Sequence, residues 1–188
     1  MKDNKSLKTP FESDDSSSYD EYPRPQLKRD SYVSLCGEWD LSVKTKDRVM
    51  PIGKIKVPFP PESRLSGIER MLKKDESYVY LRTFRIESGF NRGRIILHFG
   101  AVDQIACVKV NGIQAAINVG GYLPFSIDIS EYAHEGDNTV ELEAIDTLDK
   151  TLPYGKQRKK RGGMWYTEIS GIWQAVWLES VPREYISI

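Results

Sequence analysis

The sequence predicts an all-β fold, a sandwich or a barrel, on the strength of three observations. Short apolar runs recur along the 188-residue chain with turn residues between them. Val140, Leu142 and Ala144 alternate with Glu141 and Glu143, as in a strand with one face in the core and one in water. Helical patterning is scarce, because no segment sustains a long amphipathic stripe. The chain is therefore not expected to alternate helices with strands.

The expected strands follow from these apolar runs. In chain order they are residues 38–43, 54–57, 78–86, 94–99, 105–110, 125–129, 139–145 and 172–178. Asn111-Gly112 lies between two apolar runs and suits a tight hairpin turn whose central residues need positive φ. Helical structure is expected only as an irregular helix within 64–74 and one turn at 130–134.

One domain with a tail is expected. A chain of 188 residues can bury a sizeable core, but it is short for two full domains and a linker. Residues 1–21 contain several Ser and Asp and few large apolar groups, so burial would not offset the entropy lost on ordering. They are expected to form a disordered N-terminal tail. The prolines that follow favour an extended path along the domain surface, where the globular region begins at residue 22.

Charge and composition exclude several classes of partner. The chain has 27 Lys plus Arg and 27 Asp plus Glu, so no excess charge points to nucleic acid or an anionic membrane. The basic run at 156–161 lacks interleaved aromatics and is interpreted as a solvated loop. Residues 1–18 are too polar for a secretory signal, and no stretch approaches membrane-spanning length. A cytoplasmic location is the expectation.

No metal or cofactor is expected. Cys36 and Cys107 lie far apart and show no Cys-x-x-Cys spacing, so they are interpreted as buried thiols. His98 and His134 are the only histidines, and neither sits at metal-ligand spacing from another His or Cys.

The segment 162–179 is the most informative stretch, because it holds three of the four tryptophans beside paired glycines. From Ile172 onward, Trp173, Ala175 and Trp177 are expected on one side of a strand, after a tight turn at Gly171. Trp173 and Trp177 are interpreted as core residues, since large aromatics are usually packing material.

Several motifs resemble, in order, the N-terminal sugar-binding-type domain of glycoside hydrolase family 2, which includes β-galactosidase and β-glucuronidase. They are Pro23-Arg-Pro-Gln-Leu, Leu35-Cys-Gly-Glu-Trp-Asp, Val57-Pro-Phe-Pro-Pro, Tyr78-Val-Tyr-Leu-Arg, Leu97-His-Phe-Gly-Ala-Val-Asp, Val110-Asn-Gly, Gly120-Gly-Tyr-Leu-Pro-Phe and Trp165-Tyr-Thr-Glu-Ile-Ser-Gly-Ile-Trp-Gln. The resemblance covers residues 22–181 and implies a jelly-roll β-sandwich of the galactose-binding type. Residues 182–188 then resemble the start of a linker or strand toward an immunoglobulin-like domain.

The resemblance implies a supporting role. Family members hydrolyse glycosides on a later (β/α)₈ barrel, which alone needs about 250 residues. Retaining hydrolysis needs two carboxyl groups about 5 Å apart, and in the family both come from the barrel, so no catalytic residue is assigned here. The expected partners are the barrel and the immunoglobulin-like domain of a parent glycosidase, and carbohydrate. Whether the chain itself is an enzyme is left open, and a free-standing carbohydrate-binding module is the alternative.

Four residues are candidates for sugar binding. Asp146 matches the position where family β-galactosidases place an aspartate that reaches toward the sugar, with Asp149 as an alternate. An equal alternative for Asp146 is a turn aspartate that bonds its own backbone. Trp165, Tyr166 and Glu168 could line a sugar surface through aromatic stacking and hydroxyl hydrogen bonds. For Trp165 and Tyr166 the preferred interpretation is packing against the barrel. An asparagine that some family members carry after the Val57-Pro58 pair is missing.

Overall fold

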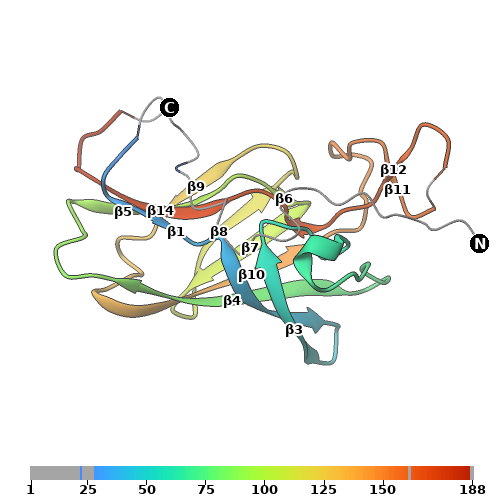
Figure 1. The fold of residues 1–188 in the computed structure, drawn as a ribbon, viewed down its shortest axis with the longest axis horizontal. Helices are drawn as coiled ribbons and strands as arrows, with labels where there is room; N and C mark the ends of the chain where they lie inside the picture. The colour runs from blue at the N-terminus through green and yellow to red at the C-terminus, as the bar shows by residue number, and fades with distance from the viewer. Residues whose placement is uncertain (1–21, 23–27, 161, 187–188) are drawn as a thin grey trace, which may run out of the picture.

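The computed structural model describes residues 22, 28–160 and 162–186, and two antiparallel β-sheets packed face to face make up most of it (Figure 1). The all-β jelly-roll sandwich expected from the sequence is confirmed. The predicted disordered tail, residues 1–21, lies outside the described residues.

The larger sheet has six strands in the order β3-β2-β4-β10-β7-β8. Its strands are β2 (Gly37–Lys44), β3 (Val49–Val57), β4 (Ser77–Ile86), β7 (Ile105–Val110), β8 (Ile113–Val119) and β10 (Gly136–Ile145). Strand β10 lies at its centre, paired with β4 on one side and β7 on the other. The Asn111-Gly112 turn joins β7 to β8 with φ of 50° and 81°, as predicted for a tight hairpin.

The smaller sheet has four strands in the order β1-β14-β5-β9. They are β1 (Tyr32–Ser34), β5 (Arg94–Phe99), β9 (Phe125–Asp128) and β14 (Val176–Val181). Two short pairs complete the fold: β6 (Val102–Asp103) with β13 (Gly171–Ile172), and β11 (Gln157–Arg158) with β12 (Tyr166–Thr167). Because β14 pairs with β1, segments from the two ends of the described chain lie side by side.

The core fills the space between the sheets. Val140, Leu142 and Ala144 are fully buried, as the alternation in β10 predicts. Trp39 is also buried, and its indole N–H donates to the carbonyl of Leu35 at 2.7 Å, so its polar group is satisfied inside the core. Phe99 stacks on Phe125 within the smaller sheet.

The predicted strand over 172–178 is wrong, because the structure divides it into β13 and β14. The chain from β5 to β6 bends at Gly100, and residues 173–175 bend with it: Gly100 N–H donates to the carbonyl of Ala175 at 2.8 Å. The tryptophans are separated as a result. Trp177 is buried and stacks on His98, whereas Trp173 is half-buried and donates its indole N–H to the carbonyl of Gly121.

Smaller expectations were met only in part. The irregular helix expected within 64–74 is reduced to the 3₁₀ helix η2 (Arg64–Ser66). Cys36 is buried as expected, but Cys107 is half-buried, and the two cysteines are not joined by a disulfide. No helix in the described part of the chain is long and apolar enough to pass through a lipid bilayer.

Candidate functional site

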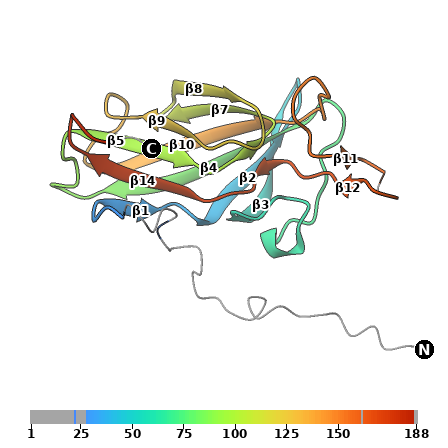
Figure 2. The same ribbon diagram turned by 90° about the horizontal axis from the view of Figure 1, so that it is seen from above.

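The candidate site lies at one end of the sandwich, where β10 ends and the chain runs through a long loop to β13. This loop, residues 146–170, carries β11 and β12, which project from that end in both views (Figures 1 and 2). All four residues that the sequence suggested for sugar binding belong to this 146–170 loop.

Asp146 follows directly after β10 and is 5% exposed. Its Oδ1 accepts a hydrogen bond from the backbone N–H of Leu148 at 2.7 Å, so Asp146 does form the turn that was its alternative interpretation. Its Oδ2 is buried and has no hydrogen-bond partner among the described residues. Burial raises the pKa of Asp146, while the Leu148 bond and the charge of Lys159 act in the opposite direction.

Two further buried carboxylates, Asp103 and Glu168, lie close enough to Asp146 to interact with it electrostatically. Asp103 Oδ2 accepts from the side-chain amide of Gln157 at 2.9 Å, and its Oδ1 has no partner among the described residues. Burial raises the pKa of Asp103 to about 6. Burial also raises the pKa of Glu168, whose nearest cation is Lys159, with Nζ 4.0 Å from Oε1.

A fourth carboxylate, Glu62, joins the loop to the chain that follows β3. It accepts hydrogen bonds from Ser170 Oγ at 2.6 Å and from the Ser170 backbone N–H at 3.1 Å. Burial raises its pKa to about 7, although the Ser170 bonds lower it. Protonated carboxyls in this range can donate as well as accept hydrogen bonds near neutral pH.

Gln157 fixes the loop to the sandwich. Its amide nitrogen donates to Asp103 and to the hydroxyl of Tyr122, both at 2.9 Å, and its amide oxygen accepts from the backbone N–H of Ile169 at 2.7 Å. Sequence reasoning missed Gln157, Asp103 and Glu62. Asp103 stood within a family motif, but nothing in the sequence marked its carboxylate as buried.

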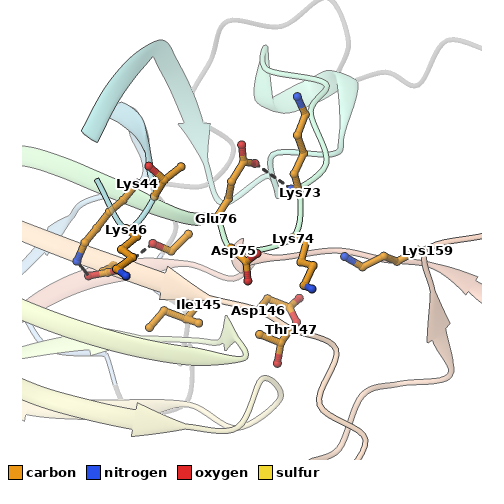
Figure 3. A pocket seen from close by; sticks show the side chains of 13 residues that line it. Lys44, Lys46, Lys73, Lys74, Asp75, Glu76, Ile145, Asp146, Thr147 and Lys159 are labelled. Atoms are coloured by element: carbon orange, nitrogen blue, oxygen red, sulfur yellow. Dashed lines mark hydrogen bonds and ion pairs between the residues drawn. The ribbon is translucent and has the colours of Figure 1, made fainter. Parts of the chain in front are cut away.

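A cavity of about 510 Å³, which we call the lysine pocket, opens beside Asp146 (Figure 3). It is lined by Lys44, Thr45, Lys46, Lys73, Lys74, Asp75, Glu76, Ser77, Glu143, Ile145, Asp146, Thr147 and Lys159. Figure 3 shows Lys74 and Lys159 extending from two sides toward Asp146 and Thr147. Asp146 is the only one of the four candidates that lines this pocket.

Trp165 and Tyr166 line a different cavity, of about 590 Å³, near the tip of the loop. The guanidinium of Arg158 lies 3.5 Å from the centroid of the Trp165 ring, a cation–π contact. Tyr166 is 65% exposed, whereas Glu168 is 1% exposed and does not lie on the surface. The structure therefore divides the four candidates between two cavities and a buried position.

No three His, Cys, Asp or Glu side chains in ranges 28–160 and 162–186, or at residue 22, gather as they would around a metal ion. That the chain needs no metal or cofactor stays a prediction. Among the described residues, Asp103 Oδ1, Asp146 Oδ2 and both Glu168 carboxylate oxygens are buried without a hydrogen-bond donor, and of these three residues Asp146 lines the lysine pocket.

Comparison with known proteins gives the family. The model of the glycosyl hydrolases family 2 sugar binding domain matches residues 12–182. A putative β-glucuronidase from Formosa agariphila is 29% identical over 109 residues, which are 57% of this chain and 12% of that protein. A β-galactosidase from Kluyveromyces lactis is 27% identical over 165 residues, 84% of this chain and 14% of that protein.

Solved structures agree on the fold. A β-glucuronidase from Ruminococcus gnavus superposes with a TM-score of 0.65 at 22% identity, covering 87% of this chain and 31% of that chain. A family 2 β-galacturonidase from Eisenbergiella tayi, bound to galacturonate, gives a TM-score of 0.59 at 20% identity, covering 80% of this chain and 24% of that chain. This chain thus spans less than a third of the length of these proteins. The chain belongs to the sugar binding domain family of the family 2 glycosyl hydrolases.

Proposed function

We propose that the chain is the non-catalytic N-terminal domain of a family 2 glycosidase of the β-galactosidase or β-glucuronidase kind, acting in carbohydrate metabolism. It supports a catalytic barrel and contributes the 146–170 loop to the rim of the sugar site. The observation that carries the proposal is the family match over residues 12–182 in a chain that spans only 12–14% of two full-length relatives.

The described residues support the non-catalytic part of this proposal. They form a β-sandwich, whereas the barrel on which the family performs hydrolysis needs about 250 residues of its own. A retaining site also needs two carboxyl groups about 5 Å apart that can reach a glycosidic bond. Asp103 and Glu168 are each 1% exposed, so neither is placed to form such a pair with Asp146 across a substrate in this chain.

The surface of the 146–170 loop supports the proposal that this loop contacts a catalytic barrel at the rim of the sugar site. Met164 is 71% exposed and Tyr166 is 65% exposed, which leaves apolar surface at the end of the sandwich. Exposed apolar groups that gather on one loop are typical of a surface covered by another domain. Asp146 lines an open pocket at the same end, as a residue of a sugar-site rim must.

A free-standing carbohydrate-binding module is the second candidate. The observation that favours it is the cavity at the loop tip, which Trp165 and Tyr166 line. Aromatic rings at the mouth of a cavity are suited to stacking on the apolar face of a pyranose.

The two functions are distinguished by calorimetric titration of the purified chain with galactose, glucuronate and a β-linked oligosaccharide, together with hydrolysis assays on chromogenic β-glycosides. The supporting-domain function predicts no turnover and no binding tighter than about millimolar. Submillimolar binding that Trp165→Ala abolishes and the control Tyr185→Ala preserves would establish the binding module instead. Turnover by this chain would overturn both.

A further inference from the structure

Strand β8 forms one edge of the larger sheet, and three large aliphatic side chains are exposed on it. Among the described residues it pairs only with β7, so the backbone N–H and C=O groups of its other side have no strand beside them. The strand lies along the rim of the sandwich in Figure 2. Its seven residues, Ile-Gln-Ala-Ala-Ile-Asn-Val, carry no charge. Ile113, Ile117 and Val119 are 55%, 57% and 57% exposed.

The other edge strands carry features that oppose pairing with a further strand. Strand β3, the opposite edge of the same sheet, contains Pro51, Lys54 and Lys56. A proline lacks the N–H that a β-ladder needs, and edge lysines resist burial beside another strand. The edges of the smaller sheet, β1 and β9, have only three and four residues. Of these four edges, β8 alone is both long and uncharged, so it is the edge that fits a partner strand.

The apolar side chains near the end of β8 lie on the outer face of the sheet, away from the core. Ile117 pairs with Cys107 of β7, and Val119 pairs with Ile105. Both β7 residues are half-buried, whereas the β7 residues between and beside them are buried in the core. A bulge interrupts the β7–β8 ladder before this point, so the edge is regular over 116–119. The regular part of the edge is therefore bordered by an apolar outer surface.

Such an edge is complementary to a second copy of itself. A twofold rotation places an edge strand antiparallel to its copy and matches the donors of each with the acceptors of the other. We propose that two copies of this chain associate through β8, with Ile117 on the twofold axis opposite the partner's Ile117. The two larger sheets then form one continuous sheet. Aliphatic side chains directly opposite one another stabilise an antiparallel pair, and no like charges meet at the axis, because β8 has none.

A second copy fits this edge better than an unrelated extended segment does. A charged segment would find no opposite charge on β8, and its backbone hydrogen bonds alone would not align an apolar row with the row formed by Cys107 and Ile117. β8 runs along the side of the sandwich, whereas the 146–170 loop projects from one end (Figure 2). A second copy and a catalytic barrel would thus cover different parts of the surface.

The test is sedimentation velocity of the purified chain between about 10 µM and 1 mM. We expect a monomer–dimer equilibrium with a dissociation constant of about 100 µM, since pairing of one short edge buries a small interface. Ile117→Lys should raise the dissociation constant at least about tenfold, because two ammonium groups then face each other across the axis. Val49→Lys charges an equally exposed aliphatic residue on the edge strand β3, and Met164→Lys charges the 146–170 loop. Both controls should preserve the dimer.

Opposite charges at position 117 test the twofold axis itself. Ile117→Glu alone should weaken the dimer as Ile117→Lys does, and an equal mixture of the two variants should associate within about threefold of the unchanged chain. The proposal is overturned if the unchanged chain stays monomeric up to about 1 mM or forms open-ended aggregates. It is also overturned if either control weakens association as much as Ile117→Lys, or if the mixture stays monomeric. None of these results bears on the supporting-domain function, which sugar binding and turnover test.

Discussion

At the scale of single residues, the buried carboxylate of Glu179 on β14 binds Tyr22 and Arg29, which precede β1. It accepts a hydrogen bond from the hydroxyl of Tyr22 and forms an ion pair with Arg29, whose Nη1 lies 2.8 Å from Oε2. The same Oε2 lies 3.4 Å from His98 Nε2. Glu179 is 1% exposed, so these contacts replace all of its hydration. This one side chain holds together residues that are 150 and 157 positions apart in the sequence.

Replacing Glu179 should therefore be costly. We expect Glu179→Gln to lower the free energy of unfolding by about 3 kcal/mol, because the Arg29 charge loses a buried partner. Urea unfolding of the variant and of the unchanged protein measures this loss of free energy. The control is Asp137→Asn, which breaks the pair with Arg85 where the side chains are 59% and 70% exposed, and it should cost less than about 0.5 kcal/mol. Equal costs for the two variants would contradict the account.

Position 171, in the motif that begins at Trp165, needs a glycine. Its φ is +70°, and a Cβ there would lie 2.1 Å from the hydroxyl oxygen of Tyr80, a fully buried side chain. We expect Gly171→Ala to destabilise the fold by about 3 kcal/mol, the sum of backbone strain and displacement of a packed ring. Gly89→Ala is the control, since φ is +78° with nothing near its Cβ, and should cost about 1 kcal/mol. If thermal unfolding shows that both variants lose similar amounts of stability, the clash with Tyr80 is not the reason that position 171 needs glycine.

At the scale of elements, the 146–170 loop is held by carboxyl groups that retain protons in the folded state. Burial raises the pKa of Glu62 from 4.5 to about 7 and that of Asp103 from 3.8 to about 6. The folded state thus binds protons that the unfolded chain releases, so this stabilisation is complete at low pH and is lost as the pH rises through the folded pKa values. Glu76 and Glu143 have lowered pKa values, so their contribution is already complete above pH 4.5.

The free energy of unfolding should consequently fall by about 4 kcal/mol between pH 5 and pH 8. Urea midpoints at the two pH values measure the change. Glu62→Gln, which keeps a donor and an acceptor for Ser170 but cannot ionise, should reduce the fall. A stability that is constant or rises over this range would show that the carboxyl groups are ionised in the folded loop.

The strands differ in how far the sequence could predict them. The strand β10 was evident because its alternation has a physical cause, one face in the core and one in water. The break between β13 and β14 was not evident, because Trp173, Ala175 and Trp177 keep the alternation. The chain bends there beside the segment at Gly100, whose backbone N–H donates to the carbonyl of Ala175. That segment lies about 75 residues away in the sequence, out of reach of any local pattern.

At the scale of the whole molecule, the fold and the family could be predicted from ordered motifs, but the site could not be assembled. Asp146 was a candidate from its position, yet the partners that define its surroundings come from segments distant in sequence. Lys74 precedes β4, Asp103 lies on β6 and Lys159 lies in the loop. Only the fold brings them to one end of the sandwich, which also separates Asp146 from Trp165 and Tyr166.

The central claim is that this end of the domain is a contact surface for a catalytic barrel. The most direct measurement is hydrogen–deuterium exchange of the chain alone and of the same residues joined to a family 2 barrel. The account predicts that backbone amides at 162–169 exchange at least about tenfold more slowly in the joined protein, because the barrel covers Met164 and Tyr166. Unchanged exchange at 162–169 would contradict it, and the domain would then be one that acts without a barrel.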